Sequence, residues 1–122
     1  MSRWREYSRE QVDALASSAP PITDPAERTC PACGATAVRK YIYEGSRLGR
    51  PISFSYVWCG NCHRYSSSTG IGISDHYDFD DPADASPTLR SLRDDNLFGL
   101  LDHLDAMWGS PGLPQWFRVR KG

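Results

Sequence analysis

Two short cysteine pairs, Cys30-Pro-Ala-Cys33 and Cys59-Gly-Asn-Cys62, contain all four cysteines of this 122-residue chain. The residues between them are rich in Tyr, Ile, Val, Phe and Trp, which favour β-strands. A CxxC turn places two sulfurs on one side, so two such turns can surround one ion with four ligands. This spacing is a strong signal for zinc, and we predict that Cys30, Cys33, Cys59 and Cys62 bind one structural Zn²⁺.

Other interpretations of the cysteines stay open at this stage. Disulfides would need an oxidising compartment, and the first residues lack the apolar stretch of a secretory signal. A thioredoxin-like redox site would use one CxxC pair rather than two. His63, directly after the second pair, could replace one cysteine as a ligand, although four cysteines already complete a shell.

A four-cysteine shell leaves no coordination position for water, so we expect a structural and not a catalytic metal. Gly34 suits the left-handed backbone that often follows a CxxC turn, whereas the second pair is followed by His63, which leaves its geometry open. Four thiolates on Zn²⁺ carry a formal charge of −2, for which nearby basic residues could compensate. These are Arg28, Arg39, Lys40 and Arg64.

At these residues the chain resembles the zinc-ribbon fold group. The resemblance rests on Cys30-Pro-Ala-Cys33-Gly34 and Cys59-Gly-Asn-Cys62, with β-rich sequence between and after them, and it covers about residues 28–68. It implies a small antiparallel sheet held by a metal. It does not specify a function, because ribbons of this kind occur in transcription factors, ribosomal proteins, enzymes, adaptors and immunity-type binding proteins.

The rest of the chain predicts helices on either side of the ribbon. Ser8 and Gln11 form a capping box for a short helix over residues 8–17, which a proline-rich linker follows. Two strands are expected over 38–44 and 52–58, joined by a flexible loop, with a third over 65–69. Ser86-Pro87 begins a C-terminal helical region that breaks near residues 94–96, and the tail could add an edge strand.

The predicted fold class is therefore α+β: a small antiparallel zinc-ribbon sheet packed by a C-terminal helix, with a short N-terminal helix. We expect one domain, since 122 residues suit one hydrophobic core. Its parts are a helix and linker over 1–27, the ribbon over 28–68, an acidic loop over 69–85, and a helical region with a tail over 86–122. Along the last helix an apolar stripe is expected to cover the sheet, with Asp102, His103 and Asp105 on its solvated side.

Charge is divided unevenly along the chain. Residues 28–64 carry six basic groups and one acidic group, a net +5, whereas residues 65–122 carry five basic and nine acidic groups, a net −4. Arg47 and Arg50 are our candidates for contact with an acidic partner, and Asp78, Asp80 and Asp81 for contact with a basic one. A calcium loop in the acidic stretch would lack its usual final glutamate.

These features favour a binding module over an enzyme. The overall charge of −1 excludes a histone-like polycation, and the three histidines lie in no recognisable catalytic motif. We predict a cytoplasmic zinc-binding protein that recognises a protein partner, as an adaptor, a regulator or an immunity-type binder, with no membrane and no small-molecule substrate. The alternative is nucleic-acid binding, since the basic ribbon is interleaved with aromatic residues.

Overall fold

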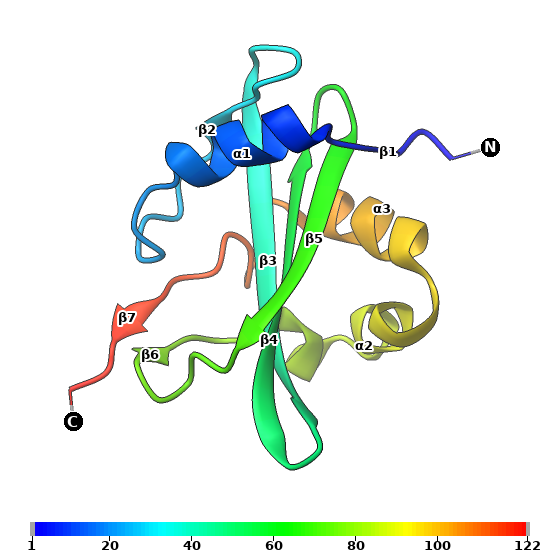
Figure 1. Cartoon of the computed structure of the whole chain (residues 1–122). Helices are drawn as coiled ribbons and strands as arrows, with labels where there is room; N and C mark the ends of the chain where they lie inside the picture. The colour runs from blue at the N-terminus through cyan, green and yellow to red at the C-terminus, as the bar shows by residue number, and fades with distance from the viewer. Residues whose placement is uncertain (1, 122) are drawn as a thin grey trace.

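A long β-hairpin forms the centre of the computed structural model, which describes residues 2–121. β3 (Thr36–Arg47) and β4 (Arg50–Cys59) pair antiparallel from Val38–Cys59 to Arg47–Arg50. Only Leu48 and Gly49 join them, and both have a positive φ, as a two-residue hairpin turn requires. The prediction of a flexible loop over residues 45–51 is therefore wrong. Both strands continue to the turn (Figure 1), because Gly49 readily adopts the positive φ that a tight turn needs.

Five strands make up the main sheet in the order β1-β5-β4-β3-β2. β5 (Arg64–Ile71) pairs antiparallel with β4, and β2 (Arg28–Thr29) pairs antiparallel with β3. β1 (Arg5–Glu6) lies parallel to the start of β5, a pairing that the sequence did not predict. The α+β class and the antiparallel ribbon strands are confirmed.

Residues 2–121 contain three α-helices, which pack on the two faces of the sheet. α1 (Arg9–Ser17) begins at the predicted capping box, in which Ser8 and Gln11 bond reciprocally. Ser86 caps α2 (Pro87–Asp95), and Asn96 both ends α2 and caps α3 (Leu97–Met107), so the predicted break is confirmed. Gly109, with a φ of 90°, follows the end of α3 and allows the chain to reverse.

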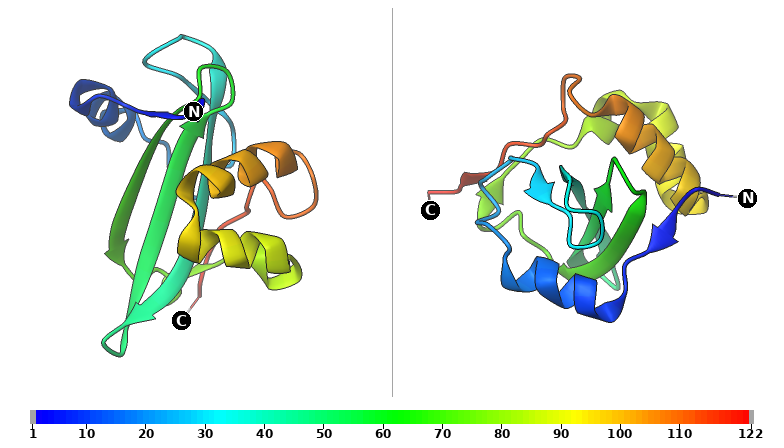
Figure 2. Two further views of the ribbon diagram at one scale, coloured as in Figure 1. Left: turned by 90° about the vertical axis from the view of Figure 1, so that its right-hand side faces the viewer. Right: turned by 90° about the horizontal axis from the view of Figure 1, so that it is seen from above.

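The two faces of the sheet bury different cores because successive side chains of a strand alternate between faces. One face is covered by α2 and α3 (Figure 2). There Tyr41 and Trp58 share a buried cluster with leucines of these helices. The opposite face carries Val38, which packs with Leu15 of α1 and with buried cysteines. The sheet thus separates a helical core from the core that surrounds the cysteines.

The acidic segment and the tail form a second, two-stranded sheet. β6 (Tyr77–Asp78) pairs antiparallel with β7 (Arg118–Val119). The tail therefore pairs with β6 and does not add an edge strand to the ribbon sheet. Between β6 and α2 lies the short helix η1 (Pro82–Ala85). Residues 69–85 are therefore not a loop throughout, since they contain the end of β5, β6 and η1.

The expectation that Asp105 is solvated is wrong. Its Oδ1 accepts hydrogen bonds from Arg39 Nη1 at 2.7 Å and from Trp58 Nε1 at 3.0 Å. Only 15% of the Asp105 side chain is exposed. Asp105 therefore joins α3 to both strands of the hairpin, because the buried indole N–H and the half-buried guanidinium both require an acceptor there.

No helix among residues 2–121 is long and apolar enough to cross a lipid bilayer.

Candidate metal centre

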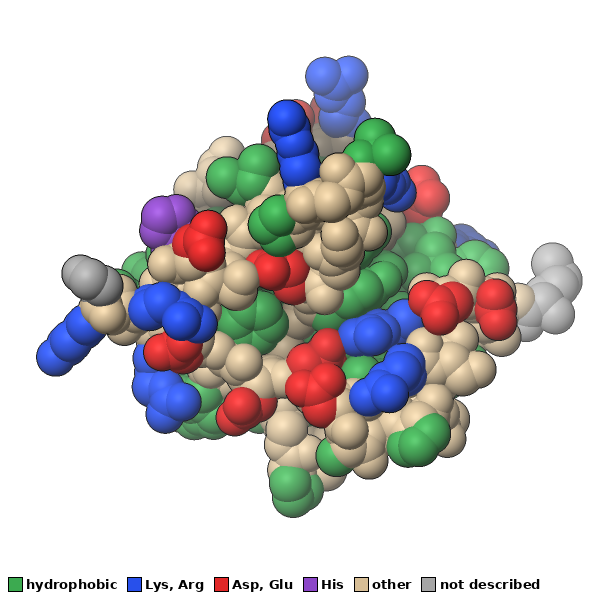
Figure 3. All heavy atoms as spheres, turned by 90° about the horizontal axis from the view of Figure 1, so that it is seen from below, with side chains coloured by type: hydrophobic (Ala, Val, Ile, Leu, Met, Phe, Trp, Pro, Cys, Tyr) green, Lys and Arg blue, Asp and Glu red, His purple; other side chains and the backbone are tan. Residues whose placement is uncertain are grey.

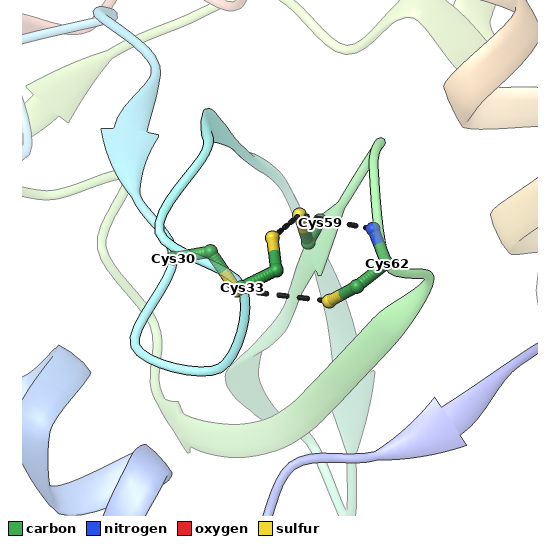
Figure 4. A group of neighbouring side chains, drawn as sticks. All are labelled: Cys30, Cys33, Cys59 and Cys62. Atoms are coloured by element: carbon green, nitrogen blue, oxygen red, sulfur yellow. Dashed lines mark hydrogen bonds between the residues drawn. The ribbon is translucent and has the colours of Figure 1, made fainter.

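Two turns at one end of the long hairpin bring the four cysteines together (Figure 4). Cys30 directly follows β2, and the turn that begins there leads into β3. Cys59 is the last residue of β4, and the second turn leads into β5. The main-chain N–H of Cys30 donates to Ala35 O at 2.8 Å, which closes the first turn. The sheet thus fixes the spacing of both turns.

Both turns have the same backbone form. Gly34 N–H donates to Cys30 O at 2.9 Å, and His63 N–H donates to Cys59 O at 3.0 Å. Gly34 has a φ of 79° and His63 a φ of 62°, so His63 adopts the left-handed conformation that glycine supplies in the first turn. The His63 ring packs edge-on against Trp4 at 5.3 Å between centroids and is not part of the group that could hold a metal.

The sulfur positions fit a tetrahedral metal site and not disulfides. Cys30 Sγ and Cys62 Sγ are 3.7 Å apart, as are Cys33 Sγ and Cys59 Sγ, and all four sulfurs lie within 4.8 Å of one another. A tetrahedron with Zn–S bonds of about 2.3 Å has edges of about 3.8 Å, whereas a disulfide bond is only about 2.05 Å long. All four cysteines are free thiols. The group can therefore hold one metal ion with the ligand set that zinc prefers.

Polar groups of the two turns direct hydrogen bonds at the sulfurs. The main-chain N–H of Ala32 points at Cys30 Sγ, and that of Asn61 at Cys59 Sγ, each at 3.4 Å. The side-chain amide of Asn61 reaches Cys33 Sγ at 3.4 Å. Such N–H groups spread the negative charge of thiolates, and their directions orient the sulfurs toward the common centre.

The environment favours the thiolate form at one cysteine and opposes it at another. The hydrogen bond from Asn61 lowers the pKa of Cys33 to about 6, helped by a backbone hydrogen bond from Ala35. Burial and the neighbouring sulfurs of Cys30 and Cys59 together raise the pKa of Cys62 to about 12. Four thiolates this close together repel one another, so a bound cation supplies the charge that lets all four ionise.

Three of the four basic side chains that could compensate the thiolates bond to other groups. Arg28 donates to Leu15 O and Ser18 Oγ, and Arg39 pairs with Glu27 at 3.0 Å as well as with Asp105. Lys40 Nζ donates to Ile22 O at 3.2 Å. Within residues 2–121, none of these side chains nor that of Arg64 forms a hydrogen bond with a cysteine sulfur. The centre relies on main-chain and neutral donors instead.

Arg47 and Arg50 lie at the opposite end of the hairpin from the cysteines. They face each other as a cross-strand pair directly before and after the turn. Together with Leu48, Ile52 and Ile71 they line a hollow of about 590 Å³. Leu48 is 97% exposed and Ile71 is 82% exposed. The structure thus combines the two candidate arginines with an exposed apolar patch that the sequence analysis did not identify.

Asp78, Asp80 and Asp81 line one hollow of about 480 Å³ but differ in their availability. Asp81 is largely committed within the chain, since it pairs with Arg93 at 2.7 Å and accepts the Tyr41 hydroxyl at 2.5 Å. Asp78 forms an exposed ion pair with Arg120 at 2.7 Å. Asp80 is exposed. On the face seen from below, acidic side chains lie next to basic ones (Figure 3).

Two side chains at the centre were missed by the sequence analysis: Tyr7, whose hydroxyl lies 3.1 Å from Cys30 Sγ, and Asn61. Asn61 lies within the second cysteine pair, which could have drawn attention to it. Tyr7 and Trp4 are buried in the cores of the two sheet faces. No local signal distinguishes a docked tyrosine from one that bonds to a sulfur.

The fold and the centre define a small α+β protein with a group of four cysteines at one end of its sheet that could hold a metal ion. Comparisons with protein families, with curated proteins and with solved structures found no match to this chain.

Proposed function

We propose that this chain is a cytoplasmic protein-interaction module in which one structural Zn²⁺ holds the sheet together and the far end of the sheet binds a protein partner. The proposed role is recognition and not catalysis, because the four cysteines use every position of a tetrahedral ion. The zinc ion would be held by Cys30, Cys33, Cys59 and Cys62. The reducing environment of the cytoplasm would keep these thiols available as ligands.

The observation that supports recognition most directly is the surface at the turn of the long hairpin. Leu48 and Ile71 expose almost their entire side chains, and Arg47 and Arg50 flank them. Exposed apolar patches with a polar rim are typical of interaction sites. Two guanidinium groups beside them favour a partner that carries carboxylates.

Zinc would contribute to recognition by stabilising the platform. The cysteine turns close one end of β3 and β4, and the two strands pair without interruption to the turn at the other end. Zinc sites of this kind contribute an apparent ~10–16 kcal/mol at neutral pH, as much as the whole stability of a small domain. Loss of the ion would therefore disorder the binding surface as well as the centre.

Partner capture from native lysate, with and without nuclease, tests this proposal. The tagged wild-type chain, a variant with Arg47→Glu and Arg50→Glu, and a control with Arg9→Glu on exposed α1 are compared. We expect nuclease-resistant capture by the wild type and the control, reduced at least ~10-fold in the hairpin variant, as for loss of two charge contacts. Capture that is unaffected by charge reversal at Arg47 and Arg50 and also at Asp78 and Asp80 would contradict the proposal.

Nucleic-acid binding is the second candidate, and one observation favours it. Tyr43 and Phe54 stack at 4.8 Å between centroids, and Tyr43 and Tyr56 at 6.2 Å, on the sheet face that also carries Arg47 and Arg50. Partly exposed rings beside arginines can stack on unpaired bases. This function would instead give capture that nuclease abolishes and a binding constant that falls steeply with salt.

A further inference from the structure

The outer edge of β5 is open over its distal half. β1 ends at Glu6, opposite Tyr65, and α1 then leads the chain away. We infer that the edge from Ser67 to Ile71 is a docking site for an extended acidic segment of a protein partner, which pairs with β5 as an added strand and places an apolar side chain in the hollow at the hairpin turn. This inference rests on the proposed function and names the partner's chemistry.

The register of β5 identifies the main-chain groups that face outward. Arg5 N–H donates to His63 O at 3.0 Å, and Tyr7 N–H donates to Tyr65 O at 2.8 Å. Because N–H and C=O groups of alternate residues point to the same side of a strand, the next outward residues are 67, 69 and 71. Within residues 2–121 their outward main-chain groups have no hydrogen-bond partner.

The opposite side of the sheet shows how this chain covers an edge. Gln115 is buried beside β3, where its Oε1 accepts from Ile42 N at 2.9 Å and its Nε2 donates to Ile42 O at 2.8 Å. One side-chain amide thus replaces a neighbouring strand and blocks further pairing. Within residues 2–121, no such side chain bonds to the outer edge of β5 beyond Tyr65. β5 lies on the side of β4 away from β3, below α1 in the left view of Figure 2.

Hollows at both ends of the open edge provide side-chain contacts. Near Tyr7, where β1 leaves β5, a hollow of about 140 Å³ reaches Ser66 and Ser67. At the other end, the hollow of about 590 Å³ includes Gly70 and Ile71 of β5 itself. An added strand that follows the edge would run from one hollow to the other. Main-chain pairing would give affinity, and the hollows would select side chains.

The charge at the distal hollow sets the character of the partner. Arg47 and Arg50 line this hollow together with apolar side chains, and no acidic residue lines it. Arg47–Arg50 and Ile52–Ile71 are cross-strand pairs, so the four side chains share one face of the sheet. A segment that carries a carboxylate and a branched apolar residue two positions apart would satisfy both parts, since residues i and i+2 of a strand face the same side.

A capped peptide with the repeat Ser-Glu-Ser-Val, which places Glu and Val on the same face of a strand, tests the inference on the full-length zinc-loaded chain. We follow backbone amide shifts and amide hydrogen exchange during titration up to about 1 mM peptide. At this concentration even weak binding, with a free energy of ~4 kcal/mol, is detected. Exchange at Ser67, Thr69 and Ile71 is expected to slow selectively, by about twofold at half saturation and more at higher occupancy. A peptide with Lys in place of Glu, and one with N-methyl groups on alternate amides, should bind at least tenfold more weakly.

Thr69→Pro removes one outward N–H without breaking a bond to β4, and proline is tolerated at such an edge position. Peptide affinity should fall at least tenfold in this variant and stay unchanged in the Arg9→Glu control. Where Thr69→Pro loses its fold or its zinc, the exposed-surface variant Ile71→Ser with Arg50→Glu provides the same test, with the same loss expected.

Several results would overturn the inference. These are no binding of the Ser-Glu-Ser-Val peptide, equal binding of the Lys peptide, or protection at other residues. Concentration-dependent dimers that protect the same amides would assign the edge to a second copy of the chain. Preferential binding of single-stranded oligonucleotides would assign the surface to nucleic acid. Lysate capture that survives Thr69→Pro but not charge reversal at Arg47 and Arg50 would leave the proposed function intact and reject the edge as its site.

Discussion

The phenolic oxygen of Tyr7 lies 3.1 Å from Sγ of Cys30 and connects the N-terminal segment to the cysteine centre. Tyr7 is only 5% exposed and directly precedes Ser8, the cap of α1. Burial raises the pKa of Tyr7 above its ordinary value, and the hydrogen bond with Cys30 raises it further. The phenol therefore stays protonated, and it is the donor when Cys30 is a thiolate, which makes Tyr7 a neutral partner for thiolate charge.

Replacement of Tyr7 by Phe is expected to weaken zinc binding by about tenfold or more, the effect typical of removing a hydrogen bond to a metal ligand. Competition with a chromophoric chelator at constant pH measures this affinity. Tyr65→Phe is the matched control, because the Tyr65 hydroxyl bonds to Glu6 and not to a sulfur. Equal affinities of wild type and Tyr7→Phe would contradict a role for this hydroxyl at the centre.

Removal of zinc is expected to unfold the sheet. Circular dichroism before and after a strong chelator should show loss of the strand signal and of the cooperative melting transition, since the ion's contribution is comparable to the total stability. Re-addition of Zn²⁺ should restore both signals. Metal analysis of protein purified under reducing conditions should give one zinc per chain. An unchanged spectrum and melting point after complete chelation would show that the fold does not need the metal.

Those parts of the fold that depend on local chemistry could be predicted from the sequence. The cysteine spacing, the capping box of Ser8 and Gln11, and the caps Ser86 and Asn96 all act within a few residues. Strand composition identified β3, β4 and β5, although each continues beyond its expected end. These short-range signals agree with the folded structure because tertiary contacts lengthen the predicted elements without replacing them.

What depended on contacts between distant segments could not be predicted. Asp105 was placed on the solvated side of its helix, yet it lies against Arg39 and Trp58, which are far away in the sequence. Asp81 was expected to contact a basic partner, but Arg93 and Tyr41 of this chain bond to its carboxylate. The spacing of residues along a helix identifies only its apolar face. An ion pair beside that face can be recognised only when the packing of the helix is known.

Replacement of Asp105 by Ala is expected to lower the free energy of unfolding by about 2–3 kcal/mol. The change removes an acceptor from a charged donor and leaves the buried indole N–H of Trp58 without its partner. Asp105→Asn should cost less, because an amide oxygen can still accept from Trp58. Urea denaturation of the zinc-loaded variants measures the difference.

Asp78→Ala serves as the comparison for Asp105, because it removes an ion pair in which both side chains are about half exposed. Its cost should stay below about 1 kcal/mol, as is usual for exposed pairs. If Asp78→Ala were as destabilising as Asp105→Ala, burial would not be the reason for the importance of Asp105.

Glu44 is expected to add a pH-dependent contribution to stability. Its carboxylate accepts from the N–H groups of Ile73 and Ser74, each at 2.9 Å, and from Ser74 Oγ at 2.8 Å, so it fixes the segment after β5 against β3. Burial alone would raise the pKa of Glu44, but these hydrogen bonds outweigh it and hold the pKa below its ordinary value.

A carboxylate whose pKa is lower in the folded than in the unfolded chain stabilises the fold above the unfolded pKa, which is about 4.3 for Glu. That stability is lost as the pH falls through the folded pKa. Glu44→Gln should therefore be about 1 kcal/mol less stable than the wild type near neutral pH, with the gap closing below about pH 4. Acid also protonates the cysteine ligands, but it does so in both proteins, so the difference between their melting temperatures reports on Glu44. A gap that widened as the pH fell would mean that the carboxyl group, and not the carboxylate, is the form held by Ile73 and Ser74.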